Sequence, residues 1–519
     1  MRRKITRLLD NDVKSYRGHN LRQSVHPDGN WISVQARNNR LLKTYVMCSI
    51  VIATLMILTA CTVGPDYVKP AAEVPASYKE MEGWKKAQPK DDALKGAWWK
   101  IFNDPQLNAL EEKVNISNQN VLLAEAQFRQ ARALVQAARA GYFPTVTVGP
   151  SATVSRMSSN LGAKTATSSG STSDFLLPAD ASWEVDIWGK IRRTVEASRA
   201  NAQSSVADLE AVRLTVQAEL AQDYFQLSNF DADRQLLDLT VVAYQKSLEM
   251  TKNQYASGVA SSADVLLAET QLKTTQAQAV DIGVQRAQME HAIALLVGTP
   301  AAVFSIPVTL LTAVPPTIPV GVPSELLERR PDIAAAERLI AAANAQIGVA
   351  ISAYYPAITL SASGGFESSS LSTLLQWPSR IWSLGSAILE TVFDGGLRRA
   401  MTEQARAAYD ANVASYRQTV LTGFQEVEDN LAALRILEDE ARVEDEAVKA
   451  AQKSLTVSIN QYKAGTVSYL NVIVAQTTAL NNEKTAIDIL GRRLTADVLL
   501  IKALGGGWDT TVMSLSDVK

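Results

Sequence analysis

The chain has 519 residues, a formal net charge of −2 and 6% aromatic residues. This length allows several compact domains or one very elongated one, and the near-neutral charge gives no electrostatic basis for binding nucleic acid. The prominence of Ala, Gln, Glu, Leu and Val favours long helices. Only His291 follows the two cysteines, Cys48 and Cys61. A Cys/His metal site or a Cys–His nucleophile pair therefore cannot be assembled from the rest of the chain, and no residue pattern indicates an enzyme.

Residues 1–60 are predicted to be a leader that contains a secretory signal. Residues 45–60 form an apolar run behind a basic flank, and this run is short for a membrane-spanning helix, which needs about 20 residues. It ends in Leu58-Thr59-Ala60-Cys61, which resembles a bacterial lipobox. Cys61 is therefore expected to carry covalent lipid such as palmitate, and two or more acyl chains would hold the protein on a bilayer.

Two alternatives remain for this N-terminal region. The apolar run is an ordinary membrane anchor with a chance cysteine, or residues 1–44 reflect translation that begins later, for instance at Met47. Thr62, rather than Asp, follows Cys61, and by resemblance to bacterial lipoproteins this favours sorting to the outer membrane.

The rest of the chain contains an internal repeat. Val121–Pro144 parallels Ile333–Pro356 at an offset of 212 residues. Three more landmarks recur at offsets of 206 or 207, namely Gly189–Arg193 with Gly395–Arg399, Tyr255–Gly258 with Tyr462–Gly465, and Asp264-Val265 with Asn471-Val472. Such agreement predicts two copies of one unit. The predicted organisation is an N-terminal lipidated segment (61–103), repeat 1 (104–299), a Pro-rich linker (300–330), repeat 2 (331–505) and a C-terminal tail (506–519).

Each repeat is predicted to contain a helix, two strands, a very long helix, a turn and another helix. The first helices cover roughly 104–141 and 331–353, and the long helices cover 190–256 and 397–463. At 1.5 Å per residue each long helix would extend ~100 Å. Apolar residues in the second long helix recur at spacings of three and four, which is typical of a packed stripe; they are Tyr409, Val413, Tyr416, Val420, Phe424, Val427, Leu431 and Leu434. Glycine tolerates the left-handed conformation that ends many helices, so Gly258 and Gly465 predict tight helical hairpins.

Four segments of about ten residues are predicted to be strands, which is the length of a tilted membrane β-strand. They are 145–154, 179–188, 357–366 and 382–393, and the Ser-rich stretches 158–173 and 367–372 join them in pairs. Four strands cannot close a barrel, and an open sheet edge cannot face lipid. The strands therefore belong either to a soluble sheet or to one barrel shared by several chains, and three chains would supply twelve strands.

Several stretches resemble the outer membrane factor family, the TolC-like and NodT-like lipoproteins of resistance-nodulation-division (RND) efflux systems. They are Cys61–Tyr67, Trp98–Leu107, Trp183–Gly189, Pro323–Ile333 and Phe393–Gly396. The resemblance implies a mainly helical homotrimer with a twelve-stranded outer-membrane barrel and a twelve-helix periplasmic tunnel. It also implies a lipid-anchored exit duct for drugs or other small toxic compounds, which meets a periplasmic adaptor (membrane fusion) protein and an inner-membrane RND pump. No cofactor is expected apart from the lipid on Cys61.

By the same resemblance, the hairpin turns are the adaptor-docking tips. This assigns docking to Gly258, Ser261, Ser262 and Asp264, and to Gly465, Thr466, Ser468 and Tyr469. The alternative is that these residues only cap helices. The resemblance also implies a periplasmic gate just after the second tip, where Asn471 and Val474 stand at positions at which many relatives have Asp. A polar Asn ring with an apolar Val ring could close by dewetting.

Two other functions compete with small-molecule efflux. One is a channel for type I protein secretion with the same fold, and the other is a periplasmic coiled-coil scaffold.

Overall fold

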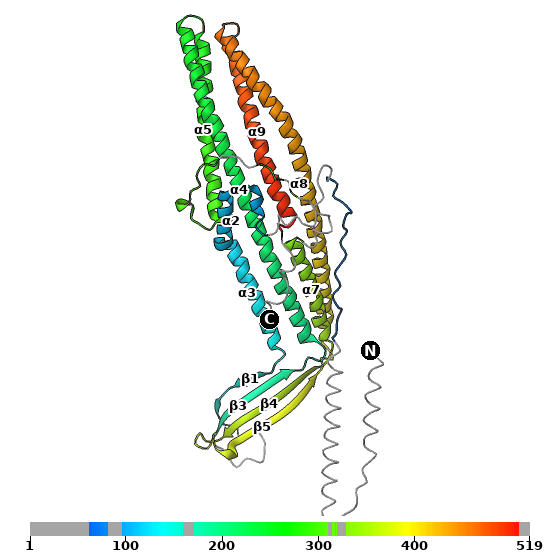
Figure 1. Ribbon diagram of the computed structural model, residues 1–519. Coiled ribbons are helices and arrows are strands. Elements are labelled where there is room, and N and C mark those ends of the chain that lie inside the picture. The colour runs from blue at the N-terminus through cyan, green and yellow to red at the C-terminus, as the bar shows by residue number, and fades with distance from the viewer. Residues whose placement is uncertain are drawn as a thin grey trace, which may run out of the picture. The chain divides into compact units, whose positions relative to one another are not determined.

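The computed structural model describes residues 62–80, 96–156, 158, 171–309, 314–316, 318 and 329–507. All of these residues belong to one compact structural unit, Thr62–Lys519. The predicted leader, Cys61 and nearly all of the predicted tail lie outside the described residues, as does most of the predicted linker beyond Thr309. The described helices are η2 (Trp98–Phe102), α2 (Pro105–Ser117), α3 (Gln119–Ala140), α4 (Lys190–Ala256), α5 (Ser262–Leu296), η3 (Ala301–Val303), α7 (Pro331–Ser352), η5 (Trp377–Ser379), α8 (Leu397–Lys463) and α9 (Tyr469–Ala503) (Figure 1).

The helices pair into two long hairpins, α4–α5 and α8–α9. Helix α4 also packs against α3, α7 and α9, and α7 lies between α4 and α8. The lengths of corresponding helices agree: α4 and α8 have 67 residues each, α5 and α9 have 35, and α3 and α7 have 22. The predicted bounds of both long helices are confirmed to the residue. Within the described part of the chain, no helix combines the length and the apolar character needed to cross a membrane.

The helix predicted at 104–141 is two helices, so that prediction of one continuous element is wrong. Asn118 separates α2 from α3 with an extended backbone (φ −66°, ψ 125°). Its side-chain oxygen accepts hydrogen bonds from the N–H groups of Asn120 (2.9 Å) and Val121 (3.1 Å), and its side-chain nitrogen donates to the carbonyl of Leu296 (2.7 Å). Asn118 therefore caps the start of α3 and ties it to the end of α5, an anchor that no local pattern indicates.

The apolar stripe of α8 forms part of the main core, as predicted. Tyr416, Val427 and Leu431 are fully buried, while Tyr409 and Val413 at the start of the stripe are partly buried against the same core. Burial of this face removes about 25 cal/mol of unfavourable hydration per Å² of apolar surface, which favours packing of α8 against its neighbours.

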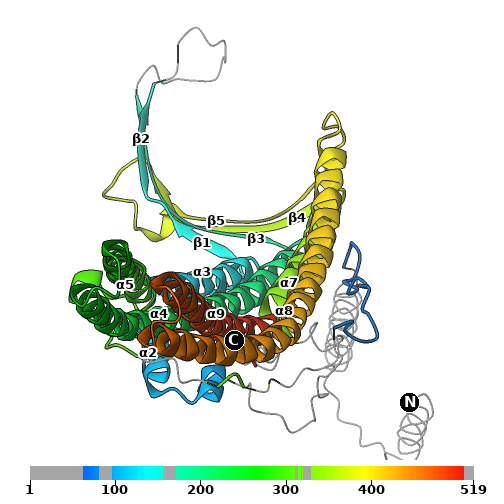
Figure 2. The same cartoon turned by 90° about the horizontal axis from the view of Figure 1, so that it is seen from above.

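The strands form one antiparallel sheet, β1-β3-β4-β5, in which β2 also pairs with β3. Their bounds are β1 (Thr145–Val148), β2 (Ser151–Ser155), β3 (Thr172–Glu184), β4 (Ala357–Ser368) and β5 (Arg380–Leu389). Strands β1 and β2 pair with successive parts of β3, so they act as one strand interrupted at Gly149 and Pro150, where proline lacks an N–H group for the ladder. Viewed from above, the sheet is strongly curved (Figure 2).

Two of the predicted strands end too late, because the residues that follow them cap helices. The carboxylate of Asp186 accepts hydrogen bonds from the backbone N–H groups of Ile191 and Arg192, both at 2.9 Å. Asp394 accepts corresponding bonds from Gly396 (2.9 Å) and Arg398 (3.2 Å). These carboxylates satisfy the free donors at the starts of α4 and α8, so the sheet stops at Glu184 and Leu389 rather than at 188 and 393.

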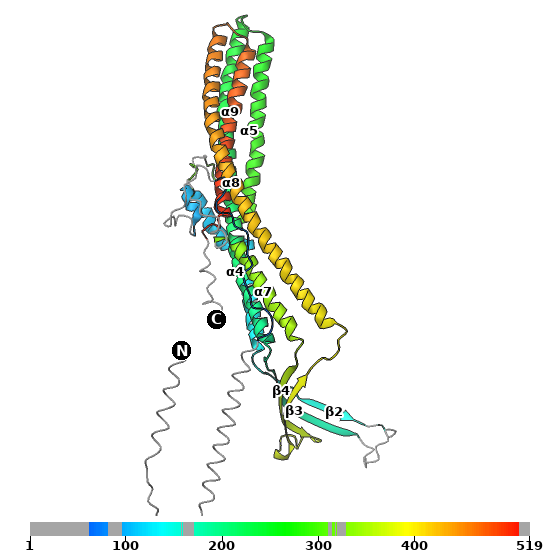
Figure 3. The ribbon, with the colours of Figure 1, turned by 90° about the vertical axis from the view of Figure 1, so that its right-hand side faces the viewer.

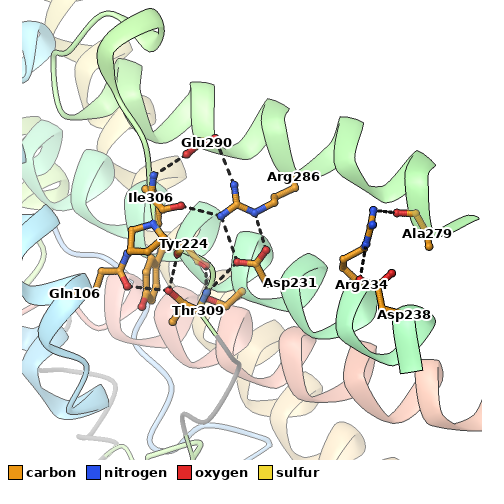
Figure 4. A network of polar contacts seen from close by, with 12 residues as sticks. Gln106, Tyr224, Asp231, Arg234, Asp238, Ala279, Arg286, Glu290, Ile306 and Thr309 are labelled. Carbon is orange, nitrogen blue, oxygen red and sulfur yellow. Dashed lines mark hydrogen bonds and ion pairs between the residues drawn. The ribbon is translucent and has the colours of Figure 1, made fainter. Parts of the chain in front are cut away.

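The first residues of the predicted linker are held by a polar network between α4 and α5 (Figure 4). Arg286 pairs with Asp231 (2.6 Å) and donates to the carbonyl of Ile306 (2.9 Å). Asp231 also accepts from the N–H of Thr309 (3.0 Å), and Glu290 accepts from the N–H of Ile306 (2.6 Å). Residues 304–309 form neither a helix nor a strand, and the short helix η3 precedes them.

Candidate functional site

The two hairpin turns have nearly the same backbone. Gly258 and Gly465 adopt φ values of 75° and 72°, as predicted, and a Cβ atom at either position would meet nothing within 4 Å. Ser261, Ser262, Thr466 and Ser468 are also exposed. Each turn therefore offers a backbone surface that another protein can approach closely.

The turns differ in how the following helix is capped. Ser261 accepts a hydrogen bond from the N–H of Asp264 (3.2 Å), and the Asp264 carboxylate accepts one from the N–H of Ser261 (2.9 Å). This is a complete capping box. In the second turn Ser468 makes no side-chain cap, and Asn471 stands at the position that corresponds to Asp264. The second turn therefore lacks the side-chain cap that Ser261 provides in the first.

Tyr469 lies in the core behind the tips rather than on their surface. Its side chain is 1% exposed, and its ring lies 5.2 Å from that of Tyr462. Both rings belong to a buried apolar cluster that includes Tyr244, Leu272 and Val472 and packs the two hairpins together. Burial raises the pKa of Tyr469 to about 12, so the side chain is neutral at physiological pH. Its place favours a packing role and leaves the other seven predicted docking residues on the surface or at its edge.

The two predicted gate residues share one exposed face of α9. Val474 is 58% exposed and Asn471 is also exposed, whereas Val472 between them is fully buried. A spacing of three residues places 471 and 474 next to each other on the helix surface. The structure therefore brings a polar and an apolar side chain together at this position, without a carboxylate at either one.

The side chains of the sheet separate into an apolar face and a polar face. The register of the ladders and the alternation along each strand define the two sets. The apolar face contains Val146, Val148, Ala152, Val154, Phe175, Leu177, Ala179, Ala181, Trp183, Ile358, Leu360, Ala362, Gly364, Phe366, Trp382, Leu384 and Ile388, together with a few polar residues, Ser173, Ser368, Arg380 and Ser386. The polar face contains Thr145, Thr147, Ser151, Thr153, Asp174, Asp180, Ser182, Glu184, Thr359, Ser361, Ser363, Glu367 and Ser383, together with a few apolar residues such as Leu176 and Leu389. Such a sheet separates an apolar environment from a polar one.

The segment just after Cys61 is fixed to the helices, which the sequence reasoning missed. Arg193 of α4 donates to the carbonyls of Val63 (3.3 Å) and Gly64 (3.4 Å) and pairs with Asp66 (2.9 Å). Gly64 has φ 96°, and a Cβ atom there would lie 2.5 Å from the Cα of Gly348 in α7. The Val-Gly-Pro-Asp run was the available signal, because glycine before proline indicates a specific backbone path.

Among the residues that the structure describes, no group of three His, Cys, Asp or Glu side chains could hold a metal ion. The features with a distinctive geometry are the tips, the exposed face of α9 and the two-faced sheet.

Comparison with known proteins assigns the chain to a family. The family described as outer membrane efflux protein matches residues 111–299 and 322–506, which is most of the chain. The chain belongs to this family. The predicted resemblance is thereby confirmed.

Individual relatives agree with this assignment. The chain is 30% identical over 459 residues to the probable efflux pump outer membrane protein TtgC of Pseudomonas putida, covering 88% of this chain and 94% of the relative. It is 31% identical to the outer membrane protein OprJ of Pseudomonas aeruginosa, covering 88% and 95%. Among solved structures, that of the outer-membrane channel OprN has a TM-score of 0.81 at 30% identity, covering 86% of this chain and all of that one.

In this outer membrane efflux protein, the Arg-Arg-Pro-Asp part of the stretch 323–333 holds three helices together through Arg330. The Arg330 side chain is buried and pairs with Asp332 (2.7 Å) and Glu426 (2.5 Å), and it donates to the carbonyl of Ala503 (3.3 Å). A Cβ atom at Gly423 of α8 would lie 3.4 Å from the guanidinium group of Arg330. One arginine therefore connects the start of α7 with α8 and the end of α9, which gives this motif a structural reason.

Proposed function

We propose that three copies of this chain form the outer-membrane exit duct of a tripartite efflux pump. The observation that carries the proposal is the two-faced sheet. An apolar face suits lipid and a polar face suits a water-filled lumen, which is the pattern of an outer-membrane barrel wall. This supports membrane strands over the soluble sheet that the sequence also allowed.

Closure of the barrel requires more than one chain. Within the described residues, β1 and β2 pair only with β3, and β5 pairs only with β4, so the outer edges of the sheet meet no strand of the same chain. Unpaired backbone groups in lipid cost several kcal/mol each. Three chains would supply twelve strands, and three is the number that the family resemblance implies. The equal lengths of corresponding helices support two repeats per chain and a tunnel wall of twelve helices.

The tips at Gly258 and Gly465 are the proposed docking points for a periplasmic adaptor that connects the duct to an inner-membrane RND pump. Their exposed serine and threonine side chains and open glycine backbones support a close approach by a partner. Asn471 and Val474 would form the periplasmic gate on the exposed face of α9. An apolar Val ring would close such a gate by excluding water.

Lipidation of Cys61 would hold the duct in the outer membrane. The N–H of Val63 donates to the carbonyl of Trp188 (3.1 Å), and Thr62 packs against Gly189. The residue bonded to Cys61 is therefore fixed where the sheet meets the helices, close to the level at which a barrel wall would leave the bilayer. This favours an acyl chain that enters the membrane from Cys61.

The names of the relatives favour efflux of small molecules over protein secretion. One relative is a toluene efflux pump outer membrane protein of Pseudomonas putida and another is the cation efflux system protein CusC of Escherichia coli. Cargo as different as toluene and a cation indicates that drugs or other small toxic compounds are selected elsewhere in the pump.

A deletion strain tests the proposal. Loss of the gene should lower resistance to several unrelated toxic compounds, and the wild-type gene should restore it. Outer-membrane fractions should contain a heat-sensitive species with three times the mass of the chain. A monomer in the soluble periplasmic fraction would contradict the duct and support the scaffold.

A further inference from the structure

A cavity of about 620 Å³ lies where the polar face of the sheet meets α7 and α8. Figure 3 shows that α8 separates from α7 as both helices approach the sheet. The cavity lies between them, and the connections that enter α4 and α8 contribute to its lining. Its volume is within the range of about 300–1,000 Å³ typical of sites for drug-sized molecules.

The wall of the cavity is mainly apolar. Ile187, Val349, Ala350, Leu397 and Met401 line it. The ring of Trp188, which stacks on Tyr355 at 4.8 Å, is part of the same wall. Such a surface is suited to a flat, apolar body.

The charged groups at the rim are already paired with one another. Lys190 lies 3.0 Å from Glu184, and Asp186 lies 3.2 Å from Arg192. Arg398 pairs with Asp394 (2.7 Å) and Glu390 (3.1 Å). A charged ligand would have to lose water without gaining a free counter-charge, which is costly. A neutral ligand avoids that cost.

The position of the cavity places it on the duct side of the wall. Glu184 and Leu389 line it, and both belong to the polar face of the sheet. This step rests on the proposed function, in which the polar face borders the lumen.

We propose that this cavity is a binding site for neutral aromatic or apolar small molecules on their way through the duct. The molecule would lie against Trp188 and Met401 and would leave towards the lumen. The duct wall would then hold apolar cargo transiently rather than only enclose a water-filled path.

Photolabelling tests the site on the purified trimer in lipid nanodiscs. Benzophenone is the neutral probe, and peptide mapping locates the adducts after irradiation. The expected label lies on Met401 and Leu397, and an excess of biphenyl should suppress it. Benzophenone-4-carboxylate, with the same ring system and a negative charge, should label these residues about tenfold less or weaker still.

Two adjacent alanines of α8 provide matched variants. Ala408 lines the cavity and Ala407 does not, and both are exposed. Ala408→Trp should lower labelling of Met401 by about tenfold or more by filling the site, whereas Ala407→Trp should leave it unchanged. Equal labelling in both variants would overturn the proposal, and so would adducts spread over the lipid-facing strands or a lack of competition by biphenyl. Drug resistance of the deletion strain tests the duct itself, so failure of the cavity and failure of the proposed function remain distinguishable.

Discussion

The network that holds residues 304–309 allows a quantitative test, because α4 contributes one aspartate to a buried ion pair with α5 and another to an exposed ion pair within α4 (Figure 4). In the buried pair the side chain of Asp231 is 2% exposed and that of Arg286 is 21% exposed. In the exposed pair, Arg234 and Asp238, the values are 42% and 55%. Replacing each aspartate by asparagine removes the same charge from the same helix in two different environments.

The expected costs differ severalfold. Removing one partner of a buried ion pair costs about 3–5 kcal/mol. Arg286 keeps its bonds to the carbonyl of Ile306 and to Glu290, so the lower end of that range, ~3 kcal/mol, is expected for Asp231→Asn. An exposed pair contributes about 0–1 kcal/mol, which sets the expectation for Asp238→Asn.

Hydrogen exchange of the amide of Ile306 measures this difference directly. That N–H donates to Glu290 and not to Asp231, so its exchange reports opening of the network rather than loss of its own acceptor. Exchange should accelerate on the order of 100-fold in Asp231→Asn and less than about fivefold in Asp238→Asn. Similar exchange rates in the two variants would refute the assignment of the network as the anchor of this segment.

Three further predictions follow from single positions. Gly64→Ala should make the segment after Cys61 susceptible to limited proteolysis, because the added Cβ would lie 2.5 Å from a backbone atom. Gly96 is the control, since it has a similar φ of 76° and open space around it. Gly96→Ala should lower the free energy of unfolding only by the ~1–3 kcal/mol that a left-handed backbone costs alanine. Burial raises the pKa of Asp497 from 3.8 to about 8, so the native state keeps a proton that the unfolded state has released between these values. The free energy of unfolding should therefore fall by about 1.4 kcal/mol per pH unit as the pH rises through that window. Asp497→Asn should flatten this dependence in denaturant titrations, and an unchanged slope would contradict a proton held there. Val474→Asp should increase the cation selectivity of single channels, whereas Leu267→Asp at the corresponding position of the first hairpin should change it less; no change in Val474→Asp would reject a gate at this residue.

Much of the helical architecture was predictable because it depends on local periodicity. The apolar stripe that begins at Tyr409 and the turns at Gly258 and Gly465 define α8 and both hairpins without reference to the rest of the chain. The strand ends were less predictable. Asp186 lies within a strand-like run and Asp394 directly follows one, and only the folded chain shows that their carboxylates cap the next helices.

Among the tip residues, too, features that depend on neighbouring residues were predictable, and features that depend on distant contacts were not. The glycine conformations followed from the sequence, because a left-handed residue at a helix end has few alternatives to glycine. The burial of Tyr469 did not, because it depends on Tyr244 of the other hairpin. Likewise, the break at Asn118 depends on a carbonyl at the end of α5, far along the chain.

The sequence by itself determined the lengths of the long helices and the family, since each of these is encoded in neighbouring residues. Only the tertiary structure decided which face of each strand is polar across the whole sheet, which segments Arg193 and Arg330 connect, and that an apolar cavity separates α7 from α8 near the sheet. These features depend on contacts between residues that are far apart in the chain. A periodic pattern predicts that a side chain is buried, but it does not predict which side chains pack against it.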